Sequence, residues 1–192
     1  LNTLTDFSKT SLTFDTVAFP GSANFAYWSS TAYPPSGLNA WYVDYSSANS
    51  FATTNTNGYH SRCVSPPTLT ETSSFTDNGN GTIKDNVTGL IWQKCSQGQT
   101  NDTACSGGAV NAPWSNALTY CNTLSLASKT WRLPNINELG SIYDFTVATG
   151  TAINTLAFPN TPGGNPGGYY WSSSTDSVAT ANGWFLNYGV AF

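Results

Sequence analysis

Side chains that could carry out catalysis are scarce in this sequence. It holds a single histidine, His60, and its glutamates are Glu71 and Glu138. A serine nucleophile needs a histidine base that a carboxylate orients, so His60 would have to serve in any such triad. His60 lies just before Arg62 and Cys63 in a segment that reads as a strand, and this context favours a structural histidine over a catalytic one. We therefore expect a chain that is not an enzyme.

A polar run that begins at Asp77 carries oxygen side chains at alternating positions, as a calcium loop does. Asp77, Asn80 and Asp85 are its best candidate ligands. Gly79 and Gly81, however, occupy positions where an EF-hand needs ligands, and no bidentate glutamate follows. Asn-Gly pairs are also typical of tight hairpin turns, because they tolerate positive φ. We therefore expect a hairpin and no cofactor, with calcium as the alternative.

The four cysteines suggest disulfide bonds. Free thiols are uncommon in oxidising compartments, and a chain rich in Ser, Thr and Asn but poor in charge is typical of secreted and surface proteins. Cys95 and Cys105 flank a short polar loop that a local bridge would close, so they are predicted to pair. Cys63 and Cys121 are the remaining candidates for disulfide bonds.

Composition excludes several classes of partner. Charged residues make up 8% of the 192-residue chain, against about 25% in typical domains. With six basic residues and a net charge of −4, the chain cannot neutralise many phosphates, so we expect no nucleic-acid partner. No apolar run approaches the ~18 residues that suggest a membrane span. The first residue is Leu1, so we expect either a removed leader or a start within a longer protein.

Two long segments of the chain resemble each other. Residues 19–45 begin with Phe-Pro and contain Tyr-Trp-Ser-Ser, and residues 158–188 do the same. In both segments a second tryptophan follows the first at the same spacing; the four are Trp28, Trp41, Trp171 and Trp184. Matched positions lie about 140 residues apart, which indicates a duplicated domain with small loop insertions. Because the matches keep one order, two unrelated hairpins are a poor explanation.

The repeat predicts the domain organisation. Residues 1–65 are expected to be the C-terminal half of a first repeat, and residues 66–72 a Pro/Thr linker. Residues 73–192 are expected to be the N-terminal half and part of the C-terminal half of a second repeat.

The second repeat shows which elements to expect. Asn-Gly pairs within residues 75–83 predict a strand, a tight turn and another strand, and residues 90–93 predict a third strand. From Pro113 onward apolar residues recur at helical spacing, which predicts a helix. Asn135 followed by Glu138 is the pattern of a capping box, so a second helix is expected there. Two helices followed by short strands and long loops predict an α+β fold.

Aromatic and polar loop residues are the candidates for ligand contact. An exposed ring could stack on a sugar while Asn or Asp bonds its hydroxyls. The four repeated tryptophans lie at strand spacing, which favours the core over a binding surface. Loop residues that differ between the two segments are better candidates, and these include Tyr33 and Asp176.

Several long motifs together resemble a known family. They are FTDNGNGTIKDNVTGLIWQK, a helix with Trp and Cys, WRLPNINELGSI, and FP followed by YWSSS and Trp. This order is similar to that of the bacterial Lcl C-terminal domain, named for the Legionella collagen-like adhesin. The resemblance implies a C-type-lectin-like fold, with two helices packed on short twisted antiparallel sheets and long Gly/Pro/Ser loops. It also implies secreted or surface proteins, often in tandem copies.

The resemblance bears on the two remaining cysteines as well. In this fold the first helix is typically tied to the last strand of the same domain, which would concern Cys121 and Cys63. Here the two belong to different copies. Either both pair with residues outside this chain, or residues 1–65 complete the second copy, within one chain or between neighbours, and Cys63 pairs with Cys121.

The resemblance and the residues together predict a function. We expect an extracellular bacterial surface protein, a non-enzymatic lectin-like module for adhesion or ligand display. The alternative is a self-associating subunit of an extracellular filament, in which residues 1–65 complete a neighbouring repeat. The expected partners are a surface glycan or protein ligand, or other copies of the chain. An enzyme of the formylglycine-generating type would need a reactive cysteine pair, and Cys63 has no second cysteine nearby.

Overall fold

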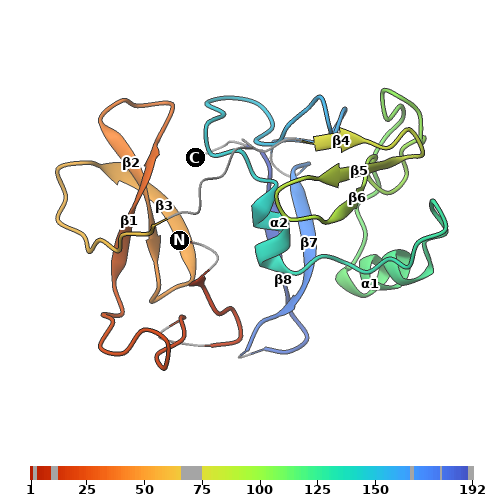
Figure 1. Cartoon of the computed structure of the whole chain (residues 1–192). Helices are drawn as coiled ribbons and strands as arrows, with labels where there is room; N and C mark the ends of the chain where they lie inside the picture. Colours follow the sequence, from red (N-terminus) through yellow and green to blue (C-terminus); the bar gives the residue numbers. More distant parts are fainter. Residues whose placement is uncertain (2–3, 10–12, 66–74, 165–166, 178, 190–192) are drawn as a thin grey trace.

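The chain forms two neighbouring lobes (Figure 1). The structure is a computed structural model that describes residues 1, 4–9, 13–65, 75–164, 167–177 and 179–189. The first lobe is residues 1–65, which we call the first copy, and the second is residues 75–189, the second copy. The predicted linker at residues 66–72 lies outside the described residues.

Both lobes are built from short antiparallel sheets, and the second also contains two helices. The first copy holds one three-stranded sheet, ordered β1-β2-β3, while the second holds β4-β5-β6 and the pair β7-β8. The predicted α+β class is confirmed. The elements are β1 (Ala26–Ala32), β2 (Asn39–Asp44), β3 (Asn49–Thr54), β4 (Phe75–Asp77), β5 (Thr82–Asp85), β6 (Ile91–Gln93), α1 (Trp114–Thr123), α2 (Ile136–Ser141), β7 (Tyr169–Thr175) and β8 (Gly183–Asn187).

The hairpins β1–β2 and β7–β8 have the same register. In the first, Trp28 pairs with Tyr42, and the pairing then shifts before the strand ends. In the second, Trp171 pairs with Phe185, and the same shift follows. A register shift at the same place in two hairpins indicates that the two hairpins are structurally equivalent. The repeat in the sequence is therefore also a repeat in the structure.

The predicted turn and helix start are both present in the second copy. β4 and β5 form a hairpin whose turn contains Gly79 and Gly81, both at positive φ. A side chain at Gly81 would collide with that of Asn101, so this position needs glycine for space as well as for backbone conformation. At α2, the Asn135 side chain accepts from the Glu138 amide at 2.9 Å, and Glu138 accepts from the Asn135 amide at 2.8 Å. This is the predicted capping box.

Each lobe has its own apolar core. The buried cluster of the first copy is Phe14, Tyr27, Val43 and Tyr45. The buried cluster of the second copy is Ile83, Leu139, Ile142, Ile153, Ala157, Phe158 and Tyr188. Five of these residues come from α2 and the loop that follows it, so the short helix is fixed by its burial as much as by its cap.

The repeated tryptophans only partly follow the prediction that they belong to the core. Trp41 is buried, but Trp28, Trp171 and Trp184 are only partly buried. In a strand, neighbouring side chains point to opposite faces. Tyr27 takes the core face of β1, so Trp28 lies on the other face.

Neither helix in the described part of the chain is long and apolar enough to cross a membrane.

Candidate functional site

Equivalent hydrogen bonds, as well as equivalent strands, occur within the two copies. The Tyr45 hydroxyl donates to the main-chain oxygen of Leu1 at 3.0 Å. The Tyr188 hydroxyl donates in the same way to Leu139, also at 3.0 Å. In each copy a buried tyrosine thus ties the hairpin to an equivalent main-chain oxygen, since Leu1 and Leu139 are matched positions. Positions in the two copies can therefore be matched residue by residue.

In the first copy a short extended segment, residues 59–64, lies along β1; we call it the closing segment. The His60 amide donates to the Ala26 oxygen at 3.0 Å, and the His60 oxygen accepts from the Trp28 amide at 2.8 Å. These bonds form a parallel bridge. The closing segment therefore covers the edge of β1 that β2 leaves open.

Arg62 anchors the closing segment in the first copy. Its guanidinium lies 4.7 Å from the ring centre of Phe19 and 5.9 Å from that of Tyr27. It also donates to the Ser22 hydroxyl at 2.6 Å. Stacking on aromatic faces is a favoured contact of arginine. The remaining space among Arg62 and its neighbours is only about 10 Å³.

The matched place in the second copy is an open cavity of about 740 Å³. The counterparts of the three residues around Arg62 are Phe158, Tyr170 and Thr161, and all three line the cavity. The other walls come from β6, α1 and residues 131–134. The apolar stripe predicted around α1 consists of Trp114, Ala117, Leu118, Cys121 and Leu124. Of these, Ala117, Cys121 and Leu124 line the cavity, together with Tyr120, which was not part of the predicted stripe. The cavity is the candidate functional site, because large aromatic-lined hollows are where proteins bind ligands.

On β7 beside the cavity, the two groups that match the paired groups of β1 have no partner among the described residues, whereas the Ser173 amide farther along β7 donates to the Pro134 oxygen at 2.7 Å. The Trp171 amide and the Tyr169 oxygen correspond to the two β1 groups that bond the closing segment. Within the described residues, β8 is the only strand paired with β7, and no bond from another segment reaches these two groups. The rings along this hairpin are also exposed, Tyr169 by 39% and Phe185 by 49%.

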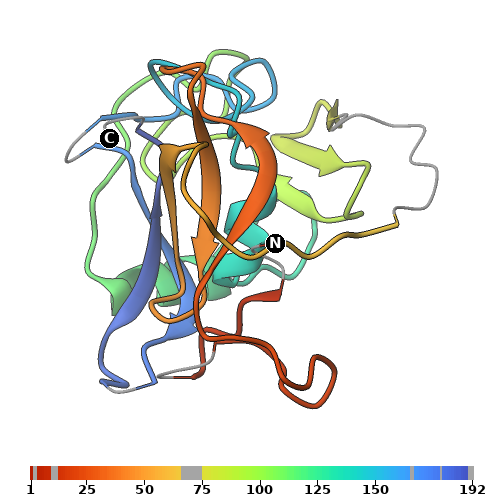
Figure 2. The same ribbon diagram turned by 90° about the vertical axis from the view of Figure 1, so that its left-hand side faces the viewer.

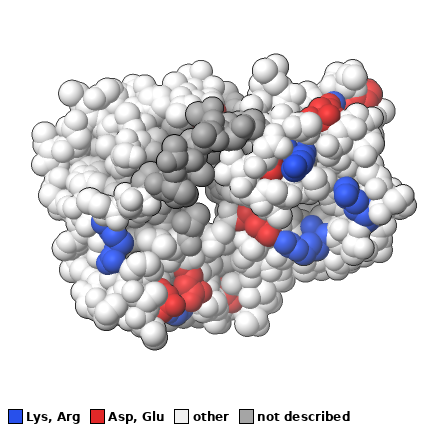
Figure 3. Space-filling view, viewed as in Figure 1, with Lys and Arg blue, Asp and Glu red and all other residues white. Residues whose placement is uncertain are grey.

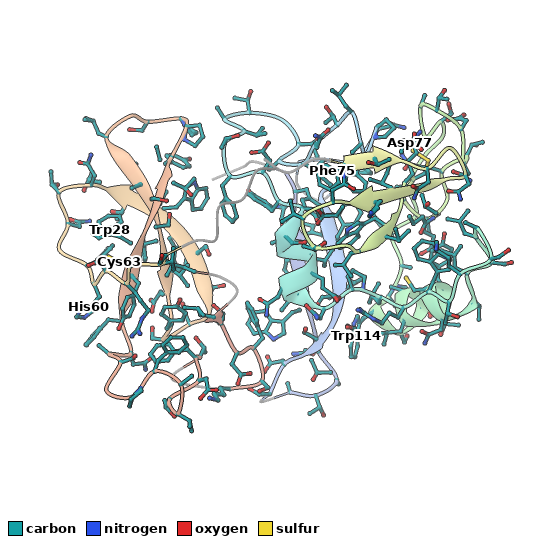
Figure 4. The ribbon with its side chains drawn as sticks, in the orientation of Figure 1. Trp28, His60, Cys63, Phe75, Asp77 and Trp114 are labelled. Atoms are coloured by element: carbon teal, nitrogen blue, oxygen red, sulfur yellow. A yellow bond between two sulfur atoms is a disulfide. The ribbon has the colours of Figure 1, made fainter. Side chains whose placement is uncertain are left out.

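The four cysteines fall into two classes. Cys95 and Cys105 form a disulfide and are both buried. Cys63 and Cys121 are free thiols, Cys63 exposed and Cys121 partly buried in the wall of the cavity. Burial raises the pKa of the Cys121 thiol. Cys63 lies in the first lobe (Figure 4), on the opposite side of the molecule from α1, which carries Cys121 (Figure 1). The structure does not join them within the chain.

The candidate calcium ligands are engaged by protein donors. Asp77 accepts from Lys94 at 2.8 Å, a bond that is the main reason for its lowered pKa. Asn80 accepts from the Thr82 hydroxyl at 2.7 Å, and Asp85 accepts from the turn that follows it. In the ranges that the structure describes, no three His, Cys, Asp or Glu side chains form a group that could hold a metal ion.

The candidate ligand contacts, Tyr33 and Asp176, occupy matched positions. The Tyr33 amide donates to Asn39, and the Asp176 amide donates to Asn182, so each residue begins the turn of its hairpin. The β1–β2 turn lies at the top of the molecule and the β7–β8 turn at the bottom (Figures 1 and 2). The structure therefore does not bring the two residues into one site.

The two copies pack on each other through equivalent residues. Phe7 of the first copy meets Trp184 of the second, with ring centres 5.3 Å apart. Phe145 and Trp41, their counterparts in the opposite copies, lie 5.4 Å apart. Both contacts are edge-to-face, a favoured geometry for aromatic pairs. The interface is therefore reciprocal, like that of a twofold dimer formed within one chain.

His60 and the charged side chains of the described residues do not gather into a second candidate site. His60 lies beside the rings of Phe25 and Tyr27, with centroid distances of 5.8 and 5.2 Å. Arg132 makes two hydrogen bonds to Glu138, which lower the pKa of that carboxyl. Acidic and basic side chains are few and interspersed on the face shown in Figure 3.

Sequence reasoning missed both the cavity and the reciprocal interface. The interface did leave a signal, because Phe7 and Phe145 are repeated at matched positions, as are Trp41 and Trp184. An aromatic residue that is repeated in both copies but does not belong to the core of its own copy is a candidate for the interface between the copies. The cavity left no such signal, because its walls come from segments that are distant in sequence.

Comparison with known proteins agrees with this geometry. A family model, the Lcl C-terminal domain, matches residues 1–65 and 81–192. The two matched stretches fall in the first and second copies. No curated protein and no solved structure gave a match. The chain belongs to the Lcl C-terminal domain family, of which it carries two partial copies in tandem.

Proposed function

We propose that this chain is an extracellular, non-enzymatic adhesion module of a bacterial surface protein. Its family is one of surface adhesins. The observation that carries the proposal is the reciprocal packing of the two copies, which points the β1–β2 and β7–β8 turns in opposite directions (Figure 2). Loops held apart on rigid hairpins are suited to contact with ligands. The module would present the two turns that begin at Tyr33 and Asp176 to a surface glycan or protein. The Tyr33 ring is itself only partly exposed, because it packs on Trp41 with ring centres 5.5 Å apart.

The C-type-lectin-like assignment is part of this proposal. Two short helices, small antiparallel sheets and long loops support it. Sugar recognition would not use calcium at residues 77–85, because Asp77, Asn80 and Asp85 already accept hydrogen bonds from protein groups.

The absence of catalysis and of nucleic-acid binding is also proposed. His60 contacts aromatic rings, and Cys63 and Cys121 lie in different lobes, too far apart to act as a reactive pair. The net charge of −4 disfavours a phosphate backbone as partner.

Binding of the full chain to an array of neutral and acidic oligosaccharides tests the adhesion proposal. The variant with both Tyr33→Ala and Asp176→Ala should lose the retained ligand. A matched control changes Val17 and Leu156 to Ala, since these exposed apolar residues are also counterparts but lie away from the hairpin turns. Unchanged binding by the turn variant, or equal loss in the control, would contradict the assignment of these loops.

The cavity favours a second candidate function, a self-associating subunit of an extracellular filament. Its aromatic lining and the two unpaired main-chain groups of β7 are features of a surface that another segment covers. Sedimentation of the full chain over a range of concentrations tests this candidate. Mass that grows with concentration supports it, and a monomer throughout contradicts it.

A further inference from the structure

The first copy shows what kind of occupant fits the cavity of the second copy. In the first copy the closing segment fills the matched place. We propose that the cavity binds the closing segment, residues 59–64, of a second copy of this chain, as a strand added to β7. The inference rests on the second candidate function, self-association, and names the site and the segment through which it would occur.

The backbone of the donated segment would pair with two groups that are already in position. The His60 amide would donate to the Tyr169 oxygen, and the His60 oxygen would accept from the Trp171 amide. In the first copy His60 makes the same two bonds with Ala26 and Trp28. The hairpins have the same register, so the spacing of these groups is preserved. Addition of a strand to an open sheet edge is a common mode of peptide recognition, and its main-chain bonds supply affinity.

The aromatic side chain that begins the segment has a matched receptor. In the first copy the Tyr59 ring lies 4.7 Å from the ring centres of both Trp28 and Tyr42. Their counterparts, Trp171 and Phe185, both line the cavity, and Phe185 is 49% exposed. Docking of Tyr59 would cover these rings.

The cationic side chain has a matched receptor too. In the first copy Arg62 stacks on the rings of Phe19 and Tyr27 and donates to the Ser22 hydroxyl. The same three groups are present in the cavity as Phe158, Tyr170 and Thr161. Thr161 occupies the position that Ser22 has in the first copy and keeps the hydroxyl acceptor. The cavity therefore suits an arginine side chain better than an apolar one.

The second copy offers the segment more burial than its home position does. At home Cys63 is exposed and Val64 is 80% exposed. In the cavity, α1 and residues 131–134 form a wall on the side that is open in the first copy. Exchange between chains therefore keeps the home contacts and adds apolar ones, which is the condition that favours swapped assemblies.

The two free thiols supply a covalent marker of this arrangement. Cys63 follows Arg62 directly, and Cys121 faces the same cavity from α1. Joining them oxidises two thiols to one disulfide, with release of two protons and two electrons. A small-molecule disulfide such as oxidised glutathione accepts these electrons and is reduced to two thiols.

Isotope mixing tests the proposal on the full chain. Equal amounts of ¹⁴N- and ¹⁵N-labelled protein are unfolded, mixed, and refolded in a glutathione redox buffer at high protein concentration. The disulfide-linked peptides are then mapped by mass spectrometry. The proposal predicts a Cys63–Cys121 linkage in which heavy–light pairs are as frequent as same-isotope pairs. Cys63→Ser should abolish the linkage, and because Cys63 is exposed, this variant should fold normally.

The outcomes separate the inference from the function on which it rests. A protein that stays monomeric contradicts both. A protein that self-associates without linking Cys63 to Cys121 overturns the inference and leaves self-association standing. Linkage only within one chain, with no heavy–light pairs, overturns exchange between copies. A Phe185→Ala variant adds a non-covalent readout, because it removes a ring that lines the cavity of the second copy. It should weaken association by about tenfold, while Leu156→Ala, an exposed residue of the second copy outside the cavity, should not.

Discussion

Removal of the aromatic contacts between the two copies should reveal an energetic coupling of equal size on both sides of the interface. Phe145 and Trp41 form one contact, and Phe7 and Trp184 form its counterpart. The ring centres are 5.4 and 5.3 Å apart with interplanar angles of 78° and 67°. Edge-to-face pairs of this kind are worth about 0.5–1.5 kcal/mol beyond their buried area. We therefore expect a coupling of about 1 kcal/mol from each pair.

The assay is a double-mutant cycle for each contact. Phe145→Leu, Trp41→Leu and their combination are unfolded in urea, and the same set is made for Phe7 and Trp184. The Leu variants of Phe7, Phe145 and Trp184 should each lower the free energy of unfolding by about 1–2 kcal/mol, since these residues are only partly buried. Trp41→Leu should cost more, about 2–4 kcal/mol, because Trp41 is buried.

A third cycle serves as the control. It combines Trp184→Leu with a change of Phe51, an exposed ring on β3 that packs on Tyr42 in its own sheet. Distant sites add to within about 0.3–0.5 kcal/mol, so this cycle should show no coupling. Coupling below that limit in both test cycles, or in only one of them, would refute the reciprocal interface.

Three further predictions concern the second copy. Tyr188→Phe removes a fully buried hydroxyl that donates to α2 at 3.0 Å, so it should lower stability by about 1 kcal/mol and the melting temperature by about 2–4 °C. Glu138→Gln should lower stability by about 1 kcal/mol at pH 7, a figure discounted because Arg132 is 60% exposed. The folded-state pKa of Glu138 is below 4.5, so this difference should be present above pH 4.5 and disappear as the pH falls through the lowered pKa. Thermal melts of the two proteins at pH 7 and in acid below that pKa would show the difference at the first pH and its loss at the second. Replacement of Cys95 and Cys105 by Ala opens a loop whose cysteines are 10 residues apart and should cost about 2–3 kcal/mol in urea unfolding; a loss below 0.5 kcal/mol would contradict it.

Local chemistry is the part of this fold that the sequence predicts well. The capping box at Asn135 and Glu138 depends on two side chains three residues apart, and the hairpin at Gly79 depends on neighbours in the chain. The Cys95–Cys105 bridge likewise closes a short loop. Such features are fixed by a few adjacent residues, so tertiary packing has little opportunity to override them.

The parts that the sequence did not predict depend on how distant segments meet. Trp41 and Trp184 are alike in sequence and position, yet Trp41 is buried and Trp184 is only partly buried. Their exposure depends on the surroundings that the other copy provides. The cavity likewise depends on β6, α1 and β7 meeting around an open strand edge. Apolar residues such as Leu124 and Tyr170 read as core in either case, because periodicity does not distinguish a filled interior from an open one.

Hydrogen exchange at two matched amides tests most directly the claim that the first copy is closed by its own segment while the second is open. The Trp28 amide donates to His60 at 2.8 Å, whereas the matched Trp171 amide faces the cavity edge. In dilute monomeric chain the account predicts slow exchange at Trp28 and fast exchange at Trp171, with Trp171 slowing as the concentration is raised. Equal protection of the two amides in the monomer, or no change at Trp171 on self-association, would contradict it.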